Sequence, residues 1–175
     1  MKYILLCLLV IIGLSQAQEF TYPLKAPIEV FGSCEHPLEA VTEGFCVIDG
    51  DTLRVLLDKG DGWYQFTSLR ITGVNTPESR TTNDREKALA ARIKAAVTDL
   101  LAGLNPADIK IVSLEKAKFY GRTIGDLQLY SDPSFSFSKW LIANQLAQPY
   151  EGEARTGWTE EQLDFIEEGL ENIEY

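Results

Sequence analysis

The stretch FCVIDGDTLRVLLDKGDGWYQFTSLRITGV, residues 45–74, decides the fold. It contains three runs rich in β-branched and aromatic residues, at 45–49, 52–58 and 63–74, which is typical of β-strands. Gly and Asp residues separate the runs, and short turns of this composition connect antiparallel strands. The stretch therefore predicts an antiparallel meander of three strands.

Further along the chain the period of the apolar residues changes. Leucine, isoleucine and valine residues recur at helical spacing between Leu89 and Leu104, and Gly103 is a suitable stop. Three strands, a helix, two strands and another helix make a small α+β domain. Five short antiparallel strands in this order are typical of an OB-type β-barrel with a helix between strands 3 and 4 and with C-terminal helices. We expect strands at 108–117 and 122–130, and helices at 85–103, 137–148 (ended by Pro149) and 159–171 (N-capped by Thr159).

The first seventeen residues have the pattern of a secretory signal peptide. Lys2 precedes an apolar stretch, and Ser15 and Ala17 are small residues where a signal peptidase would read them. An uncleaved anchor is the alternative, but the apolar stretch of about twelve residues is shorter than the roughly 20 that span a bilayer. We therefore expect a secreted or periplasmic protein.

The mature chain is expected to have three parts. These are an N-terminal arm at 18–41, the OB-type domain at 42–150, and an acidic tail with a peripheral helix at 151–175. Cys34 and Cys46 are the two cysteines that remain after signal cleavage. An even count in an oxidising compartment predicts a disulfide between them, and two free buried thiols are the alternative.

The charge is unevenly distributed. The chain has 16 basic and 26 acidic residues, a net charge of -10. Residues 151–175 hold nine of the acids and one base, whereas residues 54–122 hold twelve bases and eight acids. An acidic whole argues against general nucleic-acid binding, but the middle of the chain does not.

The composition excludes several kinds of chemistry. His36 is the single histidine, so a Ser-His-Asp or Cys-His hydrolase lacks its base and a Cys/His zinc cluster lacks ligands. No P-loop or dinucleotide-binding fingerprint is present. An enzyme built from this chain would have to use carboxylates, arginines and a hard cation.

Three stretches supply such groups, and each alone has a plain structural interpretation. Asp49-Gly50-Asp51-Thr52 could be an ordinary turn. Arg70 lies inside an apolar strand, where a guanidinium is costly unless it is paired or used, and a structural pair with a glutamate plus a turn at 75–78 would explain it. The segment KFYGRT, residues 118–123, could be a solvated turn.

Taken together, the motifs VIDGDT, LRITGVNTPE and YGR, in this order, resemble the staphylococcal nuclease-like (thermonuclease) family. The resemblance covers about residues 42–150. It implies an exported endonuclease that hydrolyses phosphodiester bonds of DNA and RNA with calcium (Ca²⁺) and leaves 3′-phosphate ends. A carboxylate base and two arginines on a phosphate are chemically consistent with this reaction.

The resemblance also implies residue roles. Arg70 and Arg122 would bind the phosphate and stabilise its developing charge, with Tyr120 beside the phosphate. Glu78 would position or deprotonate the attacking water. The metal ligands would be Asp51, Asn75 and the backbone carbonyl of Thr76, with Asp49 behind them.

One position departs from the family pattern. Asn75 stands where a second calcium-binding aspartate is usual, so the site keeps an oxygen but loses a charge. This implies weaker calcium binding and tolerance of other divalent cations. The alternative function is a non-catalytic OB-type module that binds nucleic acid or another ligand with a degenerate active site.

Overall fold

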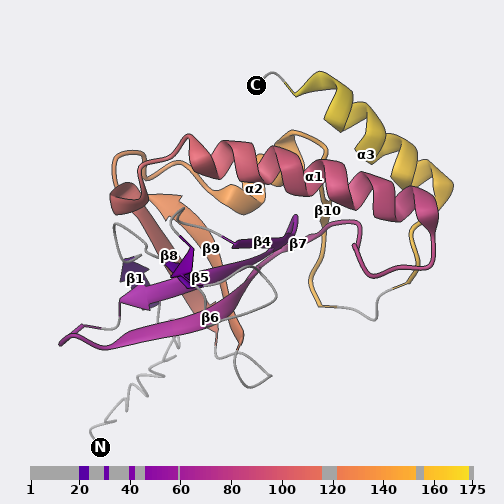
Figure 1. Cartoon of the computed structure of the whole chain (residues 1–175). Helices are drawn as coiled ribbons and strands as arrows, with labels where there is room; N and C mark the ends of the chain where they lie inside the picture. Colours follow the sequence, from indigo (N-terminus) through magenta and orange to yellow (C-terminus); the bar gives the residue numbers. More distant parts are fainter. Residues whose placement is uncertain are drawn as a thin grey trace, which may run out of the picture.

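The computed structural model describes residues 20–23, 30–31, 40–41, 46–58, 60–115, 122–152 and 156–173. The fold is mixed α+β, as predicted. One six-stranded sheet is covered on one face by helices (Figure 1). No helix in these described ranges is long and apolar enough to cross a membrane.

The predicted meander is confirmed. Strands β4 (Cys46–Asp49), β5 (Thr52–Asp58) and β6 (Tyr64–Ile71) pair antiparallel in chain order. Burial alternates along them, because Leu53 and Val55 of β5 point into the core while the residues between them point to the other face. The alternation explains why the pattern was readable from the sequence.

The second half of the sheet differs from the expected all-antiparallel arrangement. Strands β8 (Ile109–Glu115) and β9 (Arg122–Leu129) form an antiparallel pair, but β9 lies parallel to β6. The long helix between β6 and β8 carries the chain across the sheet, which permits parallel pairing. A smaller ladder joins β7 (Val74–Asn75) to β10 (Gln148–Pro149).

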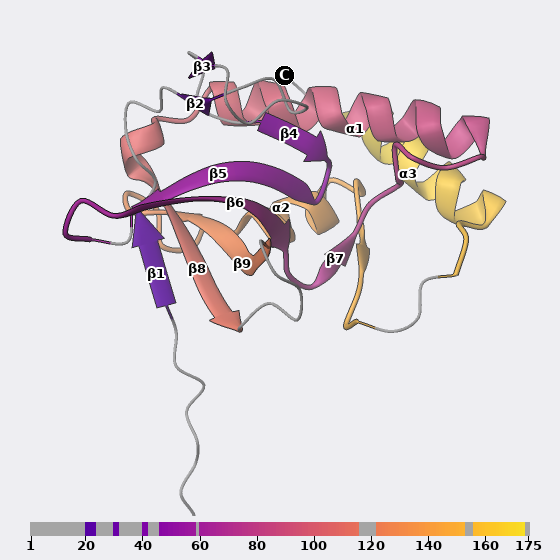
Figure 2. The ribbon, with the colours of Figure 1, turned by 60° about the horizontal axis from the view of Figure 1, so that its bottom comes forward.

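Part of the expected N-terminal arm is strand. β1 (Phe20–Pro23) pairs with the edge of β8, and β2 (Val30–Phe31) pairs with β3 (Ala40–Val41). A four-residue strand that ends in proline carries little sequence signal and fits only at a sheet edge. β1 comes close to β5 (Figure 2). Within the described residues, however, no ladder joins the edge strands β1 and β4, so a closed barrel is not seen.

Helix α1 (Asp84–Ala102) matches its prediction and ends at the C-cap Gly103. Helix α2 (Phe137–Ala143) is shorter than predicted, because it ends at Asn144 and not at Pro149. Gln145 has a positive φ of 57°, and the N–H of Leu146 donates to the carbonyl of Leu141. This left-handed cap ends the helix before the proline.

Helix α3 (Glu160–Asn172) begins at Thr159 as predicted, with a capping box completed by Gln162. The expectation that it is peripheral is wrong. Leu163 and Ile166 are fully buried in the same core as the sheet and the other helices. α3 lies alongside the first half of α1 (Figures 1 and 2). The many acidic residues of α3 made its narrow apolar face hard to recognise in the sequence.

Candidate functional site

A buried arginine–carboxylate pair lies where β4 turns into β5. A guanidinium nitrogen of Arg70 contacts Oδ1 of Asp51, and both residues are nearly inaccessible to solvent, at 9% and 2% exposure. The other terminal nitrogen of Arg70 donates to the carbonyl of Val74 at 3.0 Å and lies 3.5 Å from Oδ1 of Asn75. The pairing expected as the structural alternative for Arg70 is therefore present, with an aspartate as the partner.

The DGD turn also anchors the loop that follows β7. Oδ2 of Asp51 accepts the backbone N–H of Thr76 at 3.0 Å, and Oδ1 of Asp49 accepts that of Ser79 at 3.2 Å. The Thr52 hydroxyl donates to Oδ1 of Asp51 at 2.9 Å. The two carboxylates thus fix the course of the Thr76–Ser79 segment.

Glu86 completes the anchoring, and sequence reasoning missed it. It is buried on the first turn of α1, where Oε1 accepts the N–H of Glu78 at 3.0 Å and Oε2 accepts the hydroxyl of Thr81 at 2.7 Å. The N-cap Asn83 lies three residues before it. An Asn-x-x-Glu pattern at a helix start could have drawn attention to it. Glu86 therefore fixes the backbone position of Glu78, whose side chain is half-buried.

The strand register places the arginines on one face of the sheet. Arg70 of β6 pairs with Thr52 of β5 and Ile124 of β9, while Ser68 pairs with Arg54 and Arg122. Partners in a ladder point to the same face. We call the face that carries these residues the outer face, since the alternate positions form the core.

Arg122 is exposed, and its guanidinium makes no ion pair or hydrogen bond within the described residues. Arg122 pairs with Ser68, which lies two residues, or about 7 Å along the strand, from Arg70. Arg70 and Arg122 thus share a face, as their predicted joint role requires. They differ in that Arg70 is occupied by internal partners and Arg122 is available.

The donor set around Asp51 bears on the predicted cation. Asp51 and Asn75 offer side-chain oxygens, and the buried hydroxyl of Thr76 has no hydrogen-bond partner in the described part of the structure. The Arg70 guanidinium lies against both side chains, however, and the described ranges hold no group of three or more acidic, histidine or cysteine residues placed for a metal. These oxygens are of the type that hard cations prefer, but those of Asp51 and Asn75 already contact the Arg70 guanidinium and nearby N–H and hydroxyl donors.

Two predicted site residues lie outside the described residues: Tyr120, proposed beside the phosphate, and Cys34. Cys46 is buried and disulfide-bonded. The pairing of Cys46 with Cys34 stays a prediction, because its other half is not described.

Comparison with models of protein families finds no match to this chain, and comparison with curated proteins finds none either.

Proposed function

We propose that the protein is an exported endonuclease that hydrolyses phosphodiester bonds of DNA and RNA with the help of Ca²⁺. The observation that carries the proposal is the meeting of Asp51, Arg70, Asn75 and Thr76 at one end of the outer face, beside an exposed Arg122. These groups come from separate segments of the chain. Because these groups converge from separate segments, they support a common role, whereas three unrelated turns would have no reason to bring them together.

The arginines are suited to a phosphodiester. Attack by water builds negative charge on the non-bridging oxygens, and forked guanidinium donors stabilise that charge. Arg122 has no partner among the described residues and is exposed, so it can bind the phosphate from solvent. Arg70 has a fixed position because Asp51 and the Val74 carbonyl hold it, which lowers the entropy lost when a substrate binds.

Glu78 is the proposed base. A carboxylate that accepts a proton from water removes the need for a histidine. Its backbone is held by Glu86, so its position depends on α1 and not on a mobile turn. If a cation binds, Asp51, Asn75 and Thr76 would hold it, and it would add positive charge beside the phosphate oxygens.

The finer fold assignment is part of the same proposal. Five strands in the order β8-β9-β6-β5-β4, with α1 between β6 and β8, support an OB-type barrel related to the staphylococcal nuclease-like family. A signal peptide at residues 1–17 supports export into the periplasm or medium.

A second candidate function is a binding module without catalysis. The observation in its favour is that Arg70, a proposed phosphate ligand, already contacts Asp51, the Val74 carbonyl and Asn75. In that case the exposed Arg122 would bind a ligand on the outer face and no bond would be cut.

The test is digestion of single-stranded DNA by the chain from Gln18 to Tyr175, with calcium, with magnesium and with a chelator. We expect cleavage that requires a divalent cation. Arg122→Ala should lower kcat about 100-fold or more, the usual cost of losing one donor to the transition state. Arg92→Ala, an exposed arginine on α1, is the matched control and should retain activity. A folded protein that cuts nothing with either metal, but binds the DNA, would favour the binding module.

A further inference from the structure

We propose that Arg54, held against Phe66, binds a second phosphate of a single-stranded nucleic acid, next to the phosphate whose bond is cut. This inference rests on the proposed function and extends the site along the outer face. It assigns the substrate class as a strand with several consecutive phosphates, in which one phosphate is recognised without being cut.

The first observation is the state of the Arg54 side chain. Its Nε is buried and has no hydrogen-bond partner in the described part of the structure. Arg70, Arg85 and Arg92 each contact a carboxylate, whereas Arg54 contacts none among the described residues. A buried donor without an acceptor is costly, and an oxygen of a bound anion would remove that cost.

The second observation is what holds Arg54 in place. Its guanidinium carbon lies 5.6 Å from the centroid of the Phe66 ring, a cation–π distance. Both residues are half-buried. A guanidinium stacked on an aromatic face keeps the N–H groups along its edge for a phosphate. The charge is therefore held in position, and no carboxylate among the described side chains neutralises it.

The third observation is the register. Arg54, Ser68 and Arg122 form one row across β5, β6 and β9. Along β6, Phe66 lies two residues before Ser68, and Arg70 lies two residues after it. The stack with Phe66 therefore anchors Arg54 on the side of this row away from Arg70. Arg54 is placed to reach a phosphate next to the one at Arg70 and Arg122.

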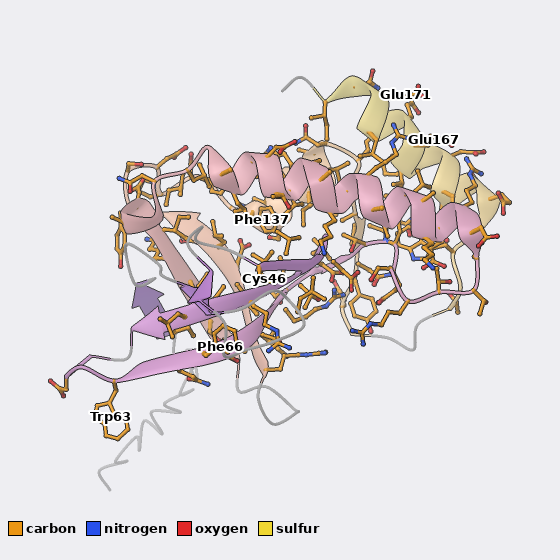
Figure 3. The ribbon with its side chains drawn as sticks, in the orientation of Figure 1. Cys46, Trp63, Phe66, Phe137, Glu167 and Glu171 are labelled. Carbon is orange, nitrogen blue, oxygen red and sulfur yellow. The ribbon has the colours of Figure 1, made fainter. Side chains whose placement is uncertain are left out.

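The combination matches how single strands are bound. Proteins that bind them line a groove with positive charges that follow the backbone, together with aromatic side chains and arginine cation–π contacts. The outer face carries Arg54, Arg70, Arg122 and Phe66, and the segment 54–122 around them holds more bases than acids. Three acidic residues of α3, Glu160, Asp164 and Glu167, pair with Arg85 of α1 (Glu167 is labelled in Figure 3).

The experiment measures binding with hydrolysis blocked by a chelator. The probes are a short fluorescein-labelled oligothymidylate, followed by fluorescence anisotropy, and the dinucleoside monophosphate of thymidine, which has one phosphate, as an unlabelled competitor. Arg54→Ala is compared with Arg54→Lys and with the matched control Lys110→Ala. Lys110 also lies over an aromatic ring, 5.3 Å from the centroid of Tyr130, but on β8.

We expect Arg54→Ala to weaken oligothymidylate binding about tenfold or more and to reduce the salt slope by about 0.7, the value for one phosphate contact of a single strand. Binding of the dinucleoside monophosphate should not change. Arg54→Lys should keep the salt slope, and Lys110→Ala should behave as the wild type. If Arg54→Ala does not fold, Phe66→Leu, which keeps the charge but frees it from the ring, should weaken oligothymidylate binding alone.

Unchanged oligothymidylate binding in Arg54→Ala, or an equal loss in Lys110→Ala, would overturn the proposal. An equal loss for the dinucleoside monophosphate would place Arg54 at the cut phosphate and would overturn it too. Cleavage with calcium is measured separately. If binding depends on Arg54 but no DNA is cleaved, the proposed nuclease activity is refuted and the second phosphate site is still supported.

Discussion

Two arginine–carboxylate clusters in this protein show how burial changes the meaning of the same chemistry. Arg70 and Asp51 form a nearly inaccessible pair of one cation and one anion, completed by a backbone carbonyl. Arg85 of α1 instead meets three carboxylates of α3, Glu160, Asp164 and Glu167, at 2.6–2.7 Å in partial exposure. Hydrogen bonds to Glu167, Asp164 and Glu160 raise the pKa of Arg85 above its ordinary value.

The comparison teaches that the number of partners does not measure their importance. Removing one side of a buried pair leaves the other charge without water, which costs several kcal/mol. Exposed pairs contribute little, because water and salt replace each partner. The buried pair of Arg70 and Asp51 is thus expected to control folding of the site. The exposed cluster around Arg85 is expected to adjust only the contact between α1 and α3.

The largest effect should come from Asp51→Asn. The substitution keeps the shape but removes the negative charge of Asp51 from beside the buried Arg70 guanidinium. We expect a loss of about 3–5 kcal/mol in the free energy of unfolding, measured by urea denaturation. Glu160→Gln in the exposed cluster is the control and should stay within about 0.5 kcal/mol of the wild type. A loss below about 1 kcal/mol for Asp51→Asn would mean that Arg70 is solvated after all.

A smaller effect should follow from Gly169→Ala on α3. A Cβ at this position would lie 2.5 Å from the carbonyl oxygen of Asn144 and 2.6 Å from Cβ of Gln145. Since backbone must move to make room, we expect a loss of about 1–3 kcal/mol by the same denaturation. This would show that close packing, more than charge, holds α3. A neutral result would assign α3 to its ion pairs.

The smallest effect should come from Arg85→Gln. It removes three exposed ion pairs while keeping the stem of the side chain, so we expect a small decrease in Tm that shrinks as salt is added. Thermal melts at low and high ionic strength measure it. A decrease as large as that of Gly169→Ala, and independent of salt, would break the distinction between the two clusters.

Sequence reasoning was most successful where a periodic pattern and its punctuation agreed. The meander, α1 with its stop at Gly103, and the Thr159 cap were all predicted, because alternation, helical spacing and capping are local properties. The end of α2 was not predicted, because Gln145 adopts the left-handed conformation there. Glycine is the residue that usually marks such a position in a sequence.

The candidate site divides in the same way. Arg70 was singled out because a guanidinium inside an apolar strand needs an explanation. The same rule, applied to Arg54, would have identified it too. Its partner was not readable, since Asp51 reaches Arg70 only when β5 and β6 pair in register and the turn folds over them.

The sequence by itself determined the five strands β4, β5, β6, β8 and β9, the main helix and the kinds of side chain that could act on a phosphate, because these follow from spacing and chemical type. Only the tertiary structure decided that Asp51 neutralises Arg70, that Glu86 holds the loop of Glu78, that β9 lies parallel to β6, and that the acidic helix α3 joins the core. The physical reason is that burial and pairing depend on contacts between residues distant in the chain, and burial determines how strongly charged side chains interact.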